Sequence, residues 1–133
     1  MQALEARFEN VSRTRVDLTT VYDGLVAALP EADDASGGLA LANSRARLRM
    51  TTLYALAAQR RALVAGTGNK VEDFGVGFYT KYGDGGVDLS PIADLMKTEV
   101  FALGQHLGIQ ASILEAPPTD GLWGDDRTDE DQL

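Results

Sequence analysis

Residues 63–88 read LVA-GTGNKVEDFGVGFYTKYGDGGVD, and this stretch decides the fold. The apolar run Leu63–Ala65 is too short for a helix and is bounded by Gly66, which is typical of a buried strand. A glycine-rich loop, residues 66–88, follows it. In an open α/β sheet, ligands bind where strands end, so we expect this loop to form a binding site.

The residue types in this loop suit a ligand that carries phosphate. Glycines let backbone N–H groups approach a phosphate, and Lys70 and Lys81 can neutralise its charge. Glu72 and the neighbouring aspartates are carboxylates of the kind that hold Mg²⁺ against phosphate oxygens. The loop therefore predicts a nucleotide site with magnesium.

The composition narrows the class of protein. The 133 residues are 44% hydrophobic and 24% charged, which is typical of one globular domain. The sequence contains no apolar run approaching the ~20 residues that span a bilayer, and residues 1–7 lack the apolar core of a signal peptide. With zero cysteines and a net charge of −8, disulfides, thiolate metal sites and nucleic-acid binding are disfavoured. We expect a cytoplasmic protein that binds neither membranes nor nucleic acid.

Several elements are expected before the loop. Residues 2–9 predict a short helix, and residues 11–16 alternate as a strand would. A helix then begins with Thr19 or Thr20 as its N-cap and runs to about Leu29, before Pro30. The polar segment 31–38 predicts an exposed loop. Apolar residues at helical spacing predict a helix over about residues 41–61.

After the loop, Ser90-Pro91 predicts the start of a helix that Gly108 terminates. Residues 113–114 predict a short extended piece, and a tail follows Pro117-Pro118. The resulting order, β-α-α-β-loop-α, predicts an α/β fold with part of a parallel sheet covered by helices. Two or three short strands are few for such a sheet, so the chain looks like the second half of a domain.

Five motifs, in order, resemble the NAD synthetase family of the ammonia-dependent type. They are A-R-x-R-M at 46–50, G-T-G-N-K-x-E-D at 66–73, F-Y-T-K-Y-G-D-G-G at 78–86, D-x-x-P-I-x-x-L-x-K at 88–97 and T-D-E-D at 128–131. The likeness is close over residues 40–133 and loose over the first 30. It implies a Rossmann-like ATP pyrophosphatase fold, which belongs to the adenine nucleotide alpha-hydrolase-like class.

The resemblance also implies a reaction. The carboxylate of nicotinic acid adenine dinucleotide (deamido-NAD) is adenylylated by MgATP, and ammonia then displaces AMP to give NAD. The carboxylate is a poor electrophile until it carries AMP, and its attack on a phosphate brings anions together, which metal ions and lysines must offset. A homodimer is implied as well, with the helix at 41–61 as a candidate contact.

For the ATP side of the site, the resemblance assigns residues by motif. Thr67, just past the strand, matches a residue that binds ATP, and Lys97 and Thr119 match two further ATP contacts. Glu72 matches the magnesium ligand.

For the dinucleotide side, Arg47, Lys81 and Asp88 match positions around deamido-NAD. Asp84, in the Tyr-Gly-Asp-Gly-Gly turn, is a further candidate. The segment 75–77 is one residue longer than in some members, so Lys81 and Asp88 are assigned from their motif rather than from their distance to Glu72.

The main departure from the family is its phosphate loop, S-G-G-x-D-S. Ser36-Gly37-Gly38 echoes it, but residues 39–43 supply no aspartate or serine and no buried strand precedes it, so we do not expect it to bind phosphate. The family's C-terminal His-Lys pair is also missing, and His106 is expected on the surface rather than in its place. We therefore expect an NAD synthetase-like domain over residues 1–133 that is incomplete at its N-terminus and truncated at its C-terminus.

Simpler interpretations of these residues stay open. Arg47 could be a solvated helix arginine, Lys97 could extend along an apolar helix face, and residues 83–86 could form an ordinary turn. Trp123 is expected to pack rather than to bind. At the level of function, the alternative is a non-catalytic remnant that folds, dimerises and binds the dinucleotide weakly. A relative acting on another carbonyl compound is a third class.

Overall fold

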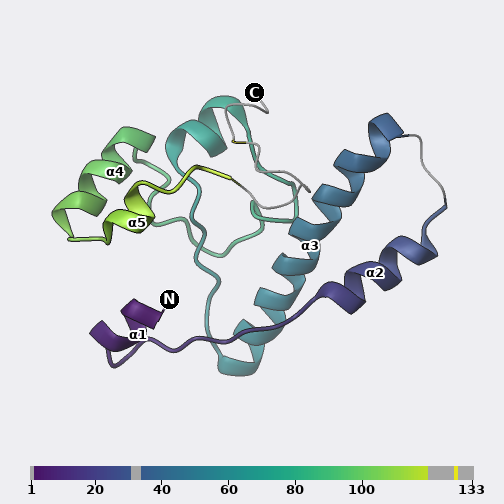
Figure 1. Cartoon of the computed structure of the whole chain (residues 1–133), viewed down its shortest axis with the longest axis horizontal. Helices are drawn as coiled ribbons and strands as arrows, with labels where there is room; N and C mark the ends of the chain where they lie inside the picture. The colour runs from purple at the N-terminus through teal and green to yellow at the C-terminus, as the bar shows by residue number, and fades with distance from the viewer. Residues whose placement is uncertain (1, 31–33, 120–127, 129–133) are drawn as a thin grey trace. The chain divides into compact units, whose positions relative to one another are not determined.

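The computed structural model describes residues 2–30, 34–119 and 128 (Figure 1). Its elements, in chain order, are α1 (Gln2–Arg7), α2 (Thr19–Ala28), α3 (Asp34–Arg60), the π-helix η1 (Lys70–Val76), α4 (Lys97–His106) and α5 (Ala111–Leu114). The chain forms two compact units, Met1–Pro30 and Glu31–Leu133.

The first unit holds α1 and α2. Past α1, the backbone N–H of Arg13 donates to Glu5 Oε1 at 2.7 Å, and the Arg13 guanidinium lies 3.9 Å from the same carboxylate. The strand predicted over residues 11–16 is wrong for the part of the chain that the structure describes. These residues have no regular secondary structure and join no ladder, because a strand needs a neighbour and none is paired with them.

Helix α2 ends as predicted and begins differently. Leu29 leaves the helix with φ −81° and ψ 147°, the extended conformation that a following proline favours. At the other end, Thr19 lies inside the helix and Leu18 occupies the N-cap position, so the predicted threonine cap is wrong. Asp17 replaces it, because its Oδ1 accepts from the Thr19 N–H at 2.9 Å.

Helix α3 is longer than predicted. The predicted helix is confirmed, and Ala42 and Ala46 on its apolar face are buried, whereas Leu53 is 52% exposed. The loop predicted over 31–38 is wrong from Asp34 onward, because α3 extends through Gly37 and Gly38. Adding a glycine to a formed helix costs only about 1 kcal/mol relative to alanine. Residues 36–38 are thus helical.

The buried strand predicted at Leu63–Ala65 is confirmed in part. Ala65 pairs with Leu89 in a parallel bridge, in which Gly66 N–H donates to Leu89 O at 2.7 Å and Leu89 N–H to Val64 O at 3.3 Å. Val64 is buried, but Leu63 is 69% exposed. Among the described residues, this bridge is all that forms of the predicted parallel sheet.

The loop after the strand contains an element that the sequence did not predict. The π-helix η1 occupies Lys70–Val76 and ends at Gly77, whose φ of +70° is the left-handed conformation that glycine adopts freely. Figure 1 shows the following segment running beside α3.

Helix α4 begins at Lys97 and not after Ser90, so the predicted start is wrong. The segment after Ser90 forms turns, and the helix begins where Glu99 Oε2 accepts from the Met96 N–H at 2.7 Å. Its end is confirmed, since Gly108 follows with φ +68°. Residues 113–114 are helical in α5, because Gln110 O accepts from both N–H groups, so the predicted extended piece is wrong. Trp123 lies outside the described residues.

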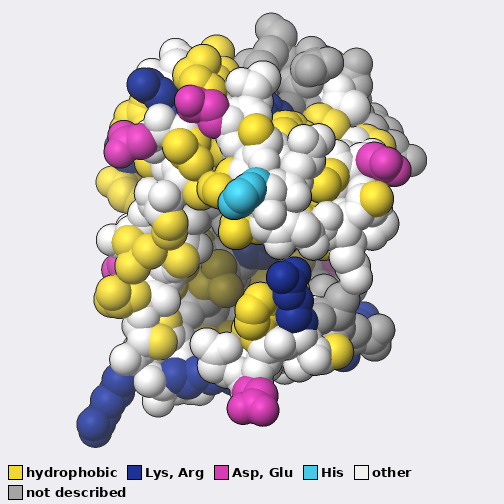
Figure 2. Space-filling model, turned by 90° about the vertical axis from the view of Figure 1, so that its left-hand side faces the viewer, with side chains coloured by type: hydrophobic (Ala, Val, Ile, Leu, Met, Phe, Trp, Pro, Cys, Tyr) yellow, Lys and Arg dark blue, Asp and Glu magenta, His cyan; other side chains and the backbone are white. Residues whose placement is uncertain are grey.

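The buried apolar core is small. In residues 34–119, its members are Ala42, Ala46 and Val64, while many large apolar side chains lie at the surface. Figure 2 shows such hydrophobic side chains exposed over much of one face. Among the helices of the described segments, none is long and apolar enough to cross a membrane.

Candidate functional site

A cavity of about 640 Å³ lies between α3, the strand and the turn that follows η1. Thr67 and Asp84, two of the predicted site residues, both line it. Much of the remaining lining is apolar and includes Leu39, Ala42, Ala46, Met50, Leu53, Val64 and Ala65. The cavity therefore combines an apolar surface with a few polar groups, as small-molecule sites do.

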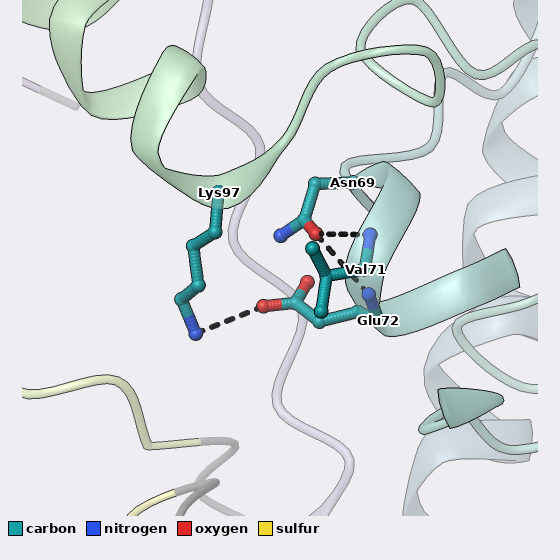
Figure 3. Close-up of polar contacts among 4 residues, drawn as sticks. All are labelled: Asn69, Val71, Glu72 and Lys97. Atoms are coloured by element: carbon teal, nitrogen blue, oxygen red, sulfur yellow. Dashed lines mark hydrogen bonds and ion pairs between the residues drawn. The ribbon is translucent and has the colours of Figure 1, made fainter. Parts of the chain in front are cut away.

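Asn69 organises the start of η1, and its side chain is buried (Figure 3). Its Oδ1 accepts from the N–H groups of Val71 at 3.0 Å and Glu72 at 3.1 Å. These N–H groups have no partner inside a helix, so a capping oxygen stabilises the first turn. Our sequence reasoning missed Asn69, although an asparagine before a run of charged residues is a helix-start signal.

Glu72 and Lys97 form an ion pair, with Nζ 3.0 Å from Oε1 (Figure 3). They come from η1 and from the first residue of α4, and Lys70 N–H donates to Leu95 O at 2.9 Å, which ties η1 to the segment before α4. Both side chains are partly exposed, so the pair contributes at most about 1 kcal/mol to stability. The structure thus brings together the predicted magnesium ligand and a predicted ATP contact.

The carboxylate of Glu72 is compatible with an Mg²⁺ ion that is also held by substrate phosphates. Among the described residues, no group of three or more His, Asp or Glu side chains could hold a metal ion by itself. Magnesium in nucleotide sites is commonly held by one or two carboxylates together with substrate phosphates. Glu72 can supply one such carboxylate, so it fits an ion that arrives with a nucleotide.

The carboxyl group of Asp73, next to Glu72, has a raised pKa. Partial burial raises the pKa of Asp73, and the negative charges of Glu72 and Asp84 raise it further. Asp73 packs against Gly68, where a Cβ atom would overlap its carboxylate. The carboxyl groups of Glu72, Asp73 and Asp84 therefore lie close enough to influence one another.

A second group of predicted residues meets on α3. Arg47 Nε donates to the carbonyl oxygen of Lys81 at 3.1 Å, which joins positions 34 residues apart. The Lys81 ammonium lies 5.0 Å from the centre of the Tyr82 ring, and Tyr82 has φ +61°. A positive φ in a tyrosine is unusual and often marks a functional turn.

Two partly buried hydrogen bonds hold this turn in place. Thr80 Oγ1 donates to Asn43 Oδ1 at 2.7 Å, and Thr80 N–H donates to Asp84 Oδ1 at 2.9 Å. Gly83 is buried against α3, and a Cβ atom there would lie 2.9 Å from the Ala46 Cβ. The turn interpretation of residues 83–86 is correct, and the turn also presents Lys81 and Asp84.

Asp88 has partners within the chain. Its Oδ1 accepts from the Tyr54 hydroxyl at 3.2 Å, and its Oδ2 accepts from the Val64 N–H at 2.8 Å. Desolvation and, after it, the hydrogen bond and charge of Asp88 raise the pKa of Tyr54. The Asp88 carboxylate therefore links Tyr54 of α3 to Val64 at the start of the strand through hydrogen bonds.

Thr119, the remaining predicted residue, makes only a local hydrogen bond. The backbone N–H of Thr119 donates to Pro117 O at 3.0 Å, and no hydrogen bond joins Thr119 to Thr67 or Glu72. His106 is exposed, as predicted. The structure thus forms three groupings: Glu72 with Lys97, Arg47 with Lys81, and Thr67 with Asp84 at the cavity.

Comparison with known proteins identifies relatives along almost the whole chain. Residues 4–133 match the family described as NAD synthase. The chain is 46% identical over 125 residues to an NH(3)-dependent NAD(+) synthetase of Carboxydothermus hydrogenoformans, which covers 93% of this chain and 51% of the relative. It is 47% identical over 118 residues to a protein of the same name from Methanococcoides burtonii, with 89% and 44% covered.

Two solved structures are similar. NMN synthetase from Francisella tularensis matches with a TM-score of 0.80 and 35% identity, over 92% of this chain and 50% of the other. The NH3-dependent NAD synthetase from Campylobacter jejuni, in complex with nitrate, matches with a TM-score of 0.66 and 31% identity, over 75% and 42%. These neighbours are consistent with the adenine nucleotide alpha-hydrolase-like fold. The chain spans about half the length of the curated relatives it matches.

Proposed function

Because this chain belongs to the NAD synthase family, we propose that it carries the ATP and deamido-NAD contacts of an ammonia-dependent NAD synthase, a ligase that forms a carbon–nitrogen bond. In this reaction a carboxylate oxygen of deamido-NAD attacks the α-phosphorus of ATP, and pyrophosphate leaves. The nitrogen of ammonia then attacks the carbonyl carbon, AMP leaves with the bonding electrons, and a proton is released. Deamido-NAD, ATP and ammonia thus give NAD, AMP and pyrophosphate.

One contact supports the ATP side above all: the ammonium of Lys97 lies 3.0 Å from the Glu72 carboxylate. Opposite charges at that separation can meet the phosphates and the cation of one bound MgATP. Lys97 would contact the phosphate oxygens, with Thr67 and Thr119 as hydroxyl donors. Glu72 would hold Mg²⁺, which when bound neutralises the phosphate charge that develops as pyrophosphate leaves.

The dinucleotide side is supported by the turn on α3. Arg47 Nε donates to the backbone carbonyl oxygen of Lys81, so two cationic residues lie near each other. Their charges would contact an anionic substrate. Asp84 lines the neighbouring cavity and would accept from a sugar or amide donor. Asp88 would contact the substrate or hold the Tyr54 end of α3 in position, since its oxygens already accept bonds from the chain.

Binding measurements on the purified chain test these assignments. Arg47→Ala should weaken deamido-NAD binding about tenfold or more, as expected for a lost charged hydrogen bond, and leave MgATP binding unchanged. Glu72→Gln should remove the Mg²⁺ dependence of ATP binding. Arg60→Ala, at the exposed end of α3, is the control for charge. Equal binding by all of these proteins would contradict the assignments.

For the isolated 133 residues we predict little or no synthase activity. The sequence has no S-G-G-x-D-S loop to position the triphosphate, and loss of such positioning costs orders of magnitude in rate. Pyrophosphate release from MgATP and deamido-NAD by the purified chain is the measurement. Turnover comparable to that of full-length relatives would contradict this prediction.

Two alternative functions are open to test. A non-catalytic dinucleotide-binding remnant would bind deamido-NAD and stay inactive even when the half that the relatives possess is added. An amidation of the mononucleotide is favoured by the similarity to an NMN synthetase, at a TM-score of 0.80. Comparing the affinities for deamido-NAD and for nicotinic acid mononucleotide shows which of the two is the preferred substrate.

Three further parts of the proposal concern the sheet, the oligomeric state and the location, and each needs its own test. We propose a partial parallel sheet flanked by helices, a homodimer with α3 as a contact, and a cytoplasmic location. Amide exchange, sedimentation velocity and cell fractionation test these in turn.

A further inference from the structure

Thr80 lies at the centre of the hydrogen bonds in the turn that follows η1. It is buried, with 8% of its surface exposed. Its hydroxyl donates to Asn43 Oδ1 at 2.7 Å, and its N–H donates to Asp84 Oδ1 at 2.9 Å. Its carbonyl oxygen accepts from the N–H groups of Gly83 at 2.9 Å and Gly85 at 3.3 Å. All three polar groups of this residue are therefore engaged within the chain.

The bond to Asn43 anchors Thr80 to a helix. Asn43 lies in α3, four residues before Arg47, whose Nε donates to the carbonyl oxygen of Lys81 at 3.1 Å. Residues four apart lie on one face of a helix, so a single face of α3 holds two consecutive residues of the turn. Groups that are fixed to a helix in this way are placed more precisely than groups on an unsupported loop.

Asp84 is bonded through one of its two carboxylate oxygens. It lines the cavity together with Asn43 and Thr80, and it is exposed. Among the described residues, the hydrogen bond that its side chain accepts is the one at Oδ1, and none reaches Oδ2. Because a carboxylate accepts through both oxygens, Oδ2 is left for a donor group of a ligand. The Thr80 N–H at Oδ1 restricts the rotation of the carboxylate and thereby sets the direction of Oδ2.

We propose that Thr80 is a positioning residue of the dinucleotide site, which holds the Asp84 carboxylate in the cavity wall as an acceptor for a donor group of deamido-NAD. The hydroxyl fixes Thr80 to α3, and the N–H then fixes Asp84. This inference rests on the proposed function, because deamido-NAD is the ligand. A residue with this role changes binding only by way of Asp84, whereas a residue that merely stabilises the turn changes it with or without that carboxylate.

Two substitutions of Thr80 separate the effect of its hydroxyl from the effect of its shape. Thr80→Val keeps the shape, removes the donor and leaves the Asn43 oxygen unpaired, so deamido-NAD should bind the purified chain about tenfold more weakly. Thr80→Ser keeps the donor, and its affinity should stay within about threefold of the unsubstituted chain. MgATP binding should be unchanged in both variants, since Glu72 and Lys97 pair with each other outside this turn. Titration calorimetry with each ligand is the measurement.

A double-mutant cycle with Asp84 tests how Thr80 acts. In the Asp84→Ala chain, Thr80→Val should change the affinity for deamido-NAD by less than about twofold, because the carboxylate that Thr80 positions is gone. The matched control is Thr20→Val, which exchanges a hydroxyl for a methyl group at an exposed position in α2. It should leave the affinity within about twofold, with or without the Asp84 carboxylate.

Amide exchange tests the hold on Asp84 without any ligand. The N–H of residue 80 is protected by its bond to Asp84, so its exchange, corrected for the intrinsic rate, should be at least about fivefold faster in Thr80→Val than in Thr80→Ser. Asn43→Ala removes the other partner of the anchoring bond and should show the same faster exchange. Circular dichroism checks that each variant retains its helices, and Asn43→Ala takes the place of Thr80→Val if that variant does not fold.

Three results would each overturn the proposal. They are equal affinities of Thr80→Val and Thr80→Ser for deamido-NAD, unchanged exchange of the residue 80 amide, and an equal loss of affinity from Thr80→Val with and without the Asp84 carboxylate. The last result would show that Thr80 only stabilises the turn. If the unsubstituted chain does not bind deamido-NAD at all, the proposed function is contradicted, and amide exchange alone then decides whether Thr80 holds Asp84.

Discussion

Asn69 controls the position of Glu72 through the backbone. Its side-chain oxygen bonds the Val71 and Glu72 N–H groups, so the first turn of η1 depends on it. A π-helical segment is rare and frequently lies at a functional site. The Glu72 side chain that faces Lys97 is therefore set by a neutral amide three residues earlier.

We predict that Asn69→Ala lowers the free energy of unfolding by about 1 kcal/mol and speeds amide exchange at Val71 and Glu72, because the cap is lost. Asn69→Ser keeps a neutral acceptor at the cap and should restore most of both. Urea unfolding and residue-resolved exchange are the measurements. If Ser and Ala behave alike, the cap is not what matters at this position.

Gly83 allows the turn at residues 83–86 to lie against α3. A Cβ atom there would come within 2.9 Å of both Ala46 and Thr80. We predict that Gly83→Ala destabilises the fold by about 1–3 kcal/mol through overpacking and weakens deamido-NAD binding.

The matched glycine is Gly24 in α2, which has no neighbour within 4 Å of an added Cβ. Gly24→Ala should instead stabilise its helix by up to about 1 kcal/mol. Thermal unfolding of both variants is the measurement, and a loss of stability in both would contradict the steric explanation.

Among the secondary-structure elements, α2 has a titratable cap. The side-chain and backbone hydrogen bonds of Thr19 lower the pKa of Asp17. Because the folded pKa lies below the unfolded value of about 3.9, the stabilisation is present above that pH and is lost as pH falls through the folded pKa.

We therefore predict that the N-terminal turn of α2 frays on acidification below about pH 4. Carbon chemical shifts of residues 19–22 from pH 6 to pH 2 are the measurement. Asp17→Asn keeps the accepting oxygen and removes the charge, so its α2 shifts should be independent of pH over this range. An identical acid transition in that variant would assign it to other carboxylates.

On the scale of the whole molecule, the small core implies low stability. With only Ala42, Ala46 and Val64 buried among the described apolar residues, we expect an unfolding free energy at or below about 5 kcal/mol, the lower limit for typical domains. Urea unfolding of the purified chain is the measurement. An unfolding free energy well above that limit would contradict this expectation.

Local patterns in the sequence were sufficient to predict several helices and their ends. The apolar stripe of α3, the end of α2 before Pro30 and the end of α4 at Gly108 all depend on residues within a turn or two of each other. The five motifs likewise were enough for family membership. Local signals failed at residues 11–16 and 113–114, where a short apolar pattern suits a strand and other structure equally well.

By itself, then, the sequence determined the family and the main helices, and it supplied the residues of the candidate site. Only the tertiary structure decided which of those residues meet: Glu72 with Lys97, Arg47 with Lys81, and Asp88 with the Val64 N–H. These pairs are 24 to 34 residues apart, so they depend on how α3, η1 and the strand pack rather than on any local preference. The same packing left one edge of residues 63–67 open, because no second strand in the described chain reaches it.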